Sequence, residues 1–365
     1  MGFPYAYDTD WSRIARLIVH EALQTRPGER VLIHADPTYF PALTEQVRIE
    51  VIRAGAVELA THVLHPAGLE RVRRQLRRRE DPELRAMEDR AVAGLFDLAD
   101  IYIWLPTSWA YNLGQTEEIL TRWRGRSIHF HWIHEPVDSA LFRTLSRCYD
   151  EALSVDREAL TAHQRRVIAA LQDRTVEVTD RRGTHLRFGL RQAHFHLGNG
   201  DCSKAFIDGY ARPGSARDRE VELPCGAIRT VDIAETEGTV VTPPETFGGR
   251  VVGSLRLEFR DNRITRLTSQ HHAAFVEGLW ASHTGDRDRF GEFNVGVSPK
   301  LTLIPGVDVI PYFGYGAGII RLSLGDNQES GGAWRSSYHQ WLFLTDATVR
   351  ADGRTVIEEG RLVVP

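Results

Sequence analysis

The first half of the sequence alternates helical patterns with short apolar runs, and this alternation most constrains the fold. Apolar residues recur at helical spacing over 11–24, Pro27-Gly28 ends that pattern, and a buried strand follows. The next helical pattern, over 42–53, again precedes a strand. Strand patterns occupy residues 31–34, 57–63, 101–105 and 128–132. Repeated units of helix and apolar strand predict a mainly parallel sheet covered by helices on both faces.

The second half has a different pattern, with short stretches of alternating polarity. Residues 175–179 and 184–188 flank the turn sequence Asp180-Arg181-Arg182-Gly183, which is typical of a hairpin. Similar pairs occur at 255–259 with 264–268 and at 346–350 with 355–357. We therefore predict an α/β N-terminal domain over 1–173, and over 174–365 an α+β C-terminal domain rich in antiparallel strands.

Composition excludes several classes of partner. The chain has 365 residues, 42% hydrophobic and 26% charged, with a net charge of −4, which gives no basis for binding nucleic acid or an anionic membrane. The first ten residues lack the basic and apolar segments of a signal peptide, so we expect a cytoplasmic protein. Three cysteines, Cys148, Cys202 and Cys225, are odd in number and far apart, which favours reduced thiols.

Five short motifs carry a family resemblance that extends over most of the chain. They are Gly183-Thr184-His185-Leu186, Leu223-Pro224-Cys225-Gly226-Ala227, Gly291-Glu292-Phe293, the strand at Arg321, and His339-Gln340-Trp341. Together they resemble the aminopeptidase T family of metallopeptidases, and equally the dihydroxypyridine ring-cleaving dioxygenases related to it.

The resemblance implies a metal site that has lost most of its ligands. Of five peptidase ligands only Glu292 and His339 remain, while Ala227, Arg321 and Trp341 stand at the other three positions. Two divalent ions held side by side need several carboxylates to offset their charge. A dinuclear aminopeptidase is therefore disfavoured.

The dioxygenase relatives imply one ferrous ion held by two histidines and a carboxylate. On that basis we expect one Fe(II) per chain, bound by Glu292, His339 and a further histidine, with Zn or no metal as alternatives. His271 and His272 follow a strand pattern, so one should point inward and complete the set. His283 lies in a polar turn and is expected to be exposed.

Two other pairs of side chains are candidates for substrate chemistry. Arg321 or Arg335 could bind a carboxylate bidentately, although a salt bridge from Arg321 to Glu292 would instead fill the vacated metal position and leave the enzyme metal-free. His194 and His196 are two residues apart, so on a strand they share a side and could relay protons or bind metal.

Aromatic residues surround His339 in the sequence and indicate the class of substrate. Trp334, Tyr338 and Trp341 near two arginines suit a planar aromatic or N-heterocyclic acid. A separate group, His129, His131 and His134, ends a predicted parallel strand, where open sheets commonly bind ligands.

These observations lead to one functional hypothesis and two alternatives. The lead hypothesis is a mononuclear non-haem metal-dependent dioxygenase that opens the ring of a small aromatic acid with O2. The alternatives are a metal-dependent or metal-free hydrolase and a non-catalytic small-molecule binding protein. The resemblance also implies a homodimer.

Overall fold

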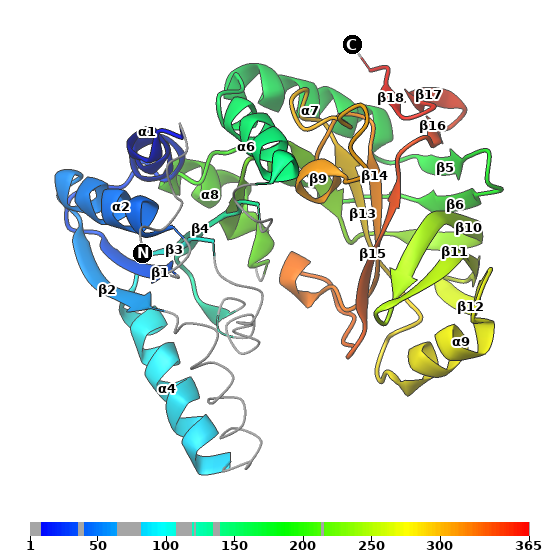
Figure 1. Ribbon diagram of the computed structural model, residues 1–365, viewed down its shortest axis with the longest axis horizontal. Helices are drawn as coiled ribbons and strands as arrows, with labels where there is room; N and C mark the ends of the chain where they lie inside the picture. The colour runs from blue at the N-terminus through cyan, green and yellow to red at the C-terminus, as the bar shows by residue number, and fades with distance from the viewer. Residues whose placement is uncertain are drawn as a thin grey trace. The chain divides into compact units, whose positions relative to one another are not determined.

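A computed structural model describes residues 9–35, 40–63, 82–106, 119, 122–133, 139–212 and 215–364 (Figure 1). Contacts within the chain divide it into two compact units. The first comprises Met1–Leu153 and Gly200–Pro224, and the second comprises Ser154–Asn199 and Cys225–Pro365. This division differs from the predicted boundary at residue 173, because residues 154–173 group with the second unit and residues 200–224 return to the first.

The first unit is built on a five-stranded parallel sheet. Its order is β2-β1-β3-β4-β8, and every neighbouring pair is parallel. The strands are β1 (Arg30–Ala35), β2 (Val57–Val63), β3 (Ile101–Trp104), β4 (Arg126–Phe130) and β8 (Glu220–Leu223). The apolar residues of β1 and β3 are almost completely buried except for the half-buried Trp104, as expected for strands covered on both faces.

Helices alternate with these strands along the chain. They are α1 (Trp11–Arg16) with the π-helical continuation Leu17–Ala22, α2 (Pro41–Arg53), α4 (Pro82–Leu98), α6 (Ala140–Leu153), α8 (Lys204–Tyr210) and a 3-10 turn at Arg217–Arg219. The side chain of Asp10 accepts the backbone N–H of Arg13 and so begins α1. In the described part of the chain, no helix has the length and apolarity needed to cross a membrane.

The second unit contains two antiparallel sheets. The larger has eight strands in the order β12-β11-β10-β6-β5-β16-β17-β18, and the smaller has five in the order β15-β14-β13-β9-β7. The larger sheet comprises β5 (Thr175–Thr179), β6 (His185–Gly189), β10 (Ala234–Phe247), β11 (Arg250–Arg260), β12 (Arg263–Ser269), β16 (Thr348–Ala351), β17 (Arg354–Glu358) and β18 (Arg361–Leu362).

The smaller sheet carries most of the residues of interest. Its strands are β7 (His196–Gly198), β9 (Ala227–Thr230), β13 (Phe290–Gly296), β14 (Ile320–Gly325) and β15 (His339–Leu344). The unit also contains α7 (Arg157–Leu171), α9 (Ala273–Ser282) and 3-10 turns at Pro311–Gly314 and Gln328–Ser330. From α7, the buried Gln164 donates its amide N–H to the carbonyls of Gly198 and Ala227 at 2.8 and 3.1 Å, which joins the helix to β7 and β9.

The structure confirms the predicted fold class and most of the predicted elements. The hairpin around Asp180 forms between β5 and β6, and the pairs β11–β12 and β16–β17 are also antiparallel. The three cysteines are buried and form no disulfide. The sequence analysis did not predict β8, whose Glu-Val-Glu-Leu sequence is short and half charged, yet β8 pairs with β4 and completes the parallel sheet.

Candidate functional site

A row of polar side chains crosses the smaller sheet of the second unit. His196 on β7 is paired with Arg229 on β9, which is paired with Asn294 on β13. Asn294 is in turn paired with Arg321 on β14, which faces Phe343 on β15. Directly paired residues of an antiparallel sheet project from the same face, so the five side chains share one face.

A second row lies beside the first on the same face. Glu292 is paired with Ser323 and Ser323 with Trp341. Each of these residues is two positions from a member of the first row, and side chains of a strand repeat with a period of two. The two rows therefore bring Glu292 close to Arg321.

Glu292 and Arg321 form a buried ion pair. Glu292 is 4% exposed and Arg321 is 1% exposed, and the Oε2 and Nη2 atoms are 3.8 Å apart. The hydroxyl of Ser323 donates to the same carboxylate oxygen at 2.8 Å, and that of Ser330 donates to the other oxygen. The carboxylate is thus held by two hydroxyl donors and a guanidinium.

Aromatic rings enclose the guanidinium groups. The guanidinium carbon of Arg321 lies 4.6 Å from the ring centroid of Trp341 and 5.6 Å from that of Tyr315. The guanidinium carbon of Arg229 also lies 5.6 Å from the ring centroid of Tyr315, and Arg229 donates a hydrogen bond to the Tyr315 hydroxyl. Two arginines in contact with one tyrosine make this a cationic, aromatic site.

Asn294 lies in the row between the two arginines and is fully buried. Neither its amide nitrogen nor its amide oxygen has a hydrogen-bond partner among the described residues. Burying an amide in this way costs free energy, because the group loses its bonds to water. The amide of Asn294 is therefore a candidate contact for a ligand.

The residues at Glu292 do not fit a metal ion. Two guanidiniums and one carboxylate, those of Arg229, Arg321 and Glu292, carry a net charge of +1, which opposes the binding of a dication. Trp341 supplies no ligand atom, and its ring packs on Arg321. Of the two arrangements that the sequence analysis considered for Arg321, the structure contains the salt bridge to Glu292.

The structure places His339 and Arg335 at the surface. Both side chains are exposed, and the Nδ1 atom of His339 is 2.9 Å from the carbonyl oxygen of Asp326. His339 contacts Trp341, with ring centroids 5.6 Å apart. His339 thus borders the cationic site by way of Trp341.

The remaining predicted histidines are dispersed. His271 and His272 are both exposed, so the expectation that one would point inward is wrong. The reason is local, because His272 has a left-handed backbone (φ 60°) and precedes α9 instead of continuing the strand.

The other three histidines differ in burial. His196 is buried in the first row, whereas the half-buried His194 lies before β7 and its backbone N–H donates to Asp232. The exposure predicted for His283 is only partial.

A second group of ligand-type side chains lies in the first unit. Among the described residues, His129, His131 and Glu222 place three potential metal-binding atoms within 4.8 Å of one another. Burial lowers the pKa of His129 well below its usual range, and the neighbouring His131 adds to this effect. His134, the third histidine of the predicted group, lies outside the described residues.

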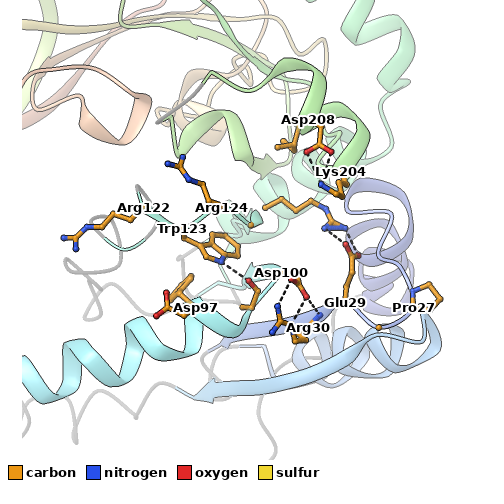
Figure 2. A pocket seen from close by; sticks show the side chains of 16 residues that line it. Pro27, Glu29, Arg30, Asp97, Asp100, Arg122, Trp123, Arg124, Lys204 and Asp208 are labelled. Carbon is orange, nitrogen blue, oxygen red and sulfur yellow. Dashed lines mark hydrogen bonds and ion pairs between the residues drawn. The ribbon is translucent and has the colours of Figure 1, made fainter.

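A pocket of about 680 Å³ in the first unit is lined by many charged residues, several of which pair with one another (Figure 2). Arg30 binds both carboxylate oxygens of Asp100 at 3.0 Å, and Arg126 binds both oxygens of Glu29 at 2.8 and 3.0 Å. The hydrogen bond from Arg30 holds the pKa of Asp100 below its usual value. Arg30 and Arg126 begin their strands, whereas open α/β sheets bind ligands at the carboxyl ends. We assign this pocket a structural role.

Solved structures of similar fold include an aminopeptidase and a dioxygenase. AmpT from Thermus thermophilus superposes with a TM-score of 0.68 at 17% identity, covering 97% of this chain and 99% of that chain. The 2,5-dihydroxypyridine dioxygenase from Pseudomonas putida KT2440 superposes with a TM-score of 0.63 at 16% identity, covering 97% of each chain. No protein-family model and no curated protein matches the sequence. The resemblance expected from the sequence motifs is confirmed at the level of fold.

Sequence analysis missed Arg229, Asn294, Tyr315 and Glu222. A usable signal existed for the first two, since Arg229 is two residues after Ala227 and Asn294 two after Glu292, on the same side of their strands. Their alignment with Arg321 depends on strand register, which the sequence does not give. Tyr315 follows a 3-10 turn and has no recognisable pattern.

Proposed function

We propose that the protein is an enzyme that binds a small aromatic or N-heterocyclic carboxylic acid at Arg229, Asn294 and Arg321. The observation that carries this proposal is the buried amide of Asn294, which has no hydrogen-bond partner in the described chain and lies between two guanidiniums. Both structural neighbours are enzymes, which supports an enzymatic role.

The charge of the site favours an anion. A carboxylate would offset the excess positive charge of the two arginines over Glu292, and guanidiniums bind carboxylates in a planar, bidentate geometry. The Asn294 amide would donate to the same anion through its nitrogen. The rings of Tyr315 and Trp341 favour a planar ligand over an extended peptide.

Calorimetric titration of matched ligands tests the binding proposal. We expect nicotinate to bind and nicotinamide, which has the same ring without the charge, to bind at least 10-fold more weakly, because a hydrogen bond to a charged group contributes about 1.5–3 kcal/mol. Arg229→Gln and Arg321→Gln should each lower the affinity for nicotinate by a similar factor. Arg256→Gln, at an exposed position of β11, is the control and should have no effect.

Equal binding of acid and amide would contradict the proposal, as would unchanged affinity in both arginine variants. The circular dichroism spectrum of each variant must match that of the wild type for the comparison to hold. A wild type that binds neither nicotinate nor indole-3-carboxylate would also count against a site for small aromatic acids.

For the reaction, we propose oxygenation of the acid's ring by O2, which the fold shared with a dioxygenase supports. We do not assign Fe(II) to Glu292 and His339, because the two guanidiniums oppose it. The fold shared with AmpT favours a hydrolase as the second candidate. Measurement with an oxygen electrode distinguishes the two reactions. Consumption of O2 with a hydroxypyridine carboxylic acid supports oxygenation, and product formation without O2 uptake supports hydrolysis.

A further inference from the structure

We infer that the first unit has a transition-metal site formed by His129, His131 and Glu222. This site is independent of the acid-binding site proposed for the second unit, and neither requires the other. Two imidazoles and one carboxylate are a ligand set that suits Zn²⁺ or Fe²⁺ better than Mg²⁺ or Ca²⁺, which prefer oxygen ligands.

Strand pairing brings the three side chains together. His129 on β4 is paired in parallel with Glu222 on β8, near the carboxyl ends of both strands. Beyond the end of β4, the N–H of His131 donates to the carbonyl of Leu223 at 3.0 Å, so the pairing continues by one step. His129 and His131 are two residues apart in extended chain and therefore project to the same side. The site thus lies at the edge where open parallel sheets bind ligands.

The distances are close to those that one ion requires. The three potential ligand atoms lie within 4.8 Å of one another, and the Nε2 atom of His131 is 3.7 Å from the Oε1 atom of Glu222. Metal–ligand bonds of about 2.0–2.2 Å separate two ligand atoms of one ion by roughly 3–3.5 Å. A small inward movement of the side chains would complete the site.

The local charge favours a dication here, in contrast to the site at Glu292. Arg217 binds both Glu220, at 2.7 Å, and Glu222, at 3.0 Å. Two carboxylates and one guanidinium carry a net charge of −1. A bound cation would offset this charge.

Packing and exposure also suit a metal site. The ring of Trp104 stacks on His129 with centroids 3.8 Å apart and planes 5° apart, which fixes the orientation of the imidazole. The side chains of His131 and Glu222 are 17% and 12% exposed, so an ion can enter from solvent. Three protein ligands leave further coordination positions for water or a small ligand.

Titration of chelator-treated protein with Co²⁺ tests this site, because the visible absorption of Co²⁺ reports the number and kind of its ligands. We expect about one Co²⁺ per chain in the wild type, and displacement by Zn²⁺. Glu222→Gln and His131→Asn should each weaken binding by more than about 100-fold, since loss of a ligand exceeds the 10–100-fold effect of losing an outer hydrogen-bond partner.

Two controls separate ligation from general disturbance. Glu220→Gln disturbs the Arg217 ion pair without removing a ligand and should retain the Co²⁺ spectrum. His339→Asn alters the second unit and should bind Co²⁺ as the wild type does. Absence of Co²⁺ binding in the wild type would overturn the inference and leave His131 and Glu222 as an ion pair only. Binding that survives Glu222→Gln and His131→Asn but is lost in His339→Asn would also overturn it.

Discussion

Arg321 is the residue on which the proposed function depends most. It stands at a position where the aminopeptidase T resemblance implies a metal-binding histidine, and its guanidinium lies 3.8 Å from the carboxylate that the resemblance implies as another ligand. The permanent positive charge of arginine cannot be removed near neutral pH, so it opposes a metal ion and favours an anion. In the proposed function, the guanidinium at this position makes the sheet face accept an anion in place of a cation.

At the residue scale, a substitution of Asn294 should change protein stability and ligand affinity in opposite directions. Asn294→Leu replaces a buried amide that has no partner in the described chain with an apolar group of similar size. We expect the free energy of unfolding to rise by about 1–3 kcal/mol, the usual cost of an unsatisfied buried polar group, while affinity for nicotinate falls.

Asn327→Leu is the matched control for this experiment. Asn327 is also buried, but its side chain donates to the Gly291 carbonyl and accepts from the Trp334 N–H, both at 2.9 Å. Its replacement should lower the free energy of unfolding. Urea denaturation measures the free energy of unfolding of both variants. A lower value for Asn294→Leu than for the wild type would contradict the proposal that the Asn294 amide lacks a partner until a ligand binds.

How far the sequence predicts the site also differs from residue to residue. The approach of Arg321 to Glu292 was one of two arrangements expected from their positions. The role of Asn294 was not foreseen, because its environment depends on which residues of β9 and β14 lie beside β13. Cross-strand register arises from tertiary packing, and a single sequence carries little information about it.

At the element scale, the smaller sheet depends on α7 for its position. Gln164 donates to one carbonyl of β7 and one of β9, strands that carry His196 and Arg229. These two buried hydrogen bonds fix the edge of the sheet against the helix, and the Gly198 carbonyl also accepts the N–H of Gly226 at 2.9 Å.

Gln164→Leu should therefore lower the free energy of unfolding by about 1–3 kcal/mol, because it removes two buried hydrogen bonds of about 0.5–1.5 kcal/mol each. It should also weaken nicotinate binding, because β9 positions Arg229. Gln172→Leu changes an exposed residue at the end of the same helix and should alter stability by less than about 0.5 kcal/mol. Thermal denaturation compares the two, and equal stability would contradict the proposed role of Gln164.

Elements with strong periodicity were predicted well and short charged ones were not. The parallel strands of the first half and the hairpins of the second have clear apolar patterns that reflect burial on two faces or one. Strand β8 has four residues, of which Glu220 and Glu222 are charged, and it is stabilised by Arg217 and by pairing with β4. Such a strand forms only because a partner strand and a counter-ion are present.

At the scale of the whole molecule, the chain passes three times between its two units, and each unit contains a candidate site of its own. The first contains a histidine and carboxylate group at the carboxyl edge of a parallel sheet, and the second contains a cationic face on an antiparallel sheet. The fold is shared with a dioxygenase and an aminopeptidase at 16% and 17% identity, so function must be argued from the sites.

The most direct test of the central claim, that the second unit is a carboxylate site, is a crystal structure of the protein with nicotinate. The account predicts that the carboxylate lies between the guanidiniums of Arg229 and Arg321, with the amide of Asn294 within hydrogen-bond distance and the ring against Trp341 or Tyr315. A metal ion bound to Glu292, or a ligand whose carboxylate avoids both arginines, would contradict it.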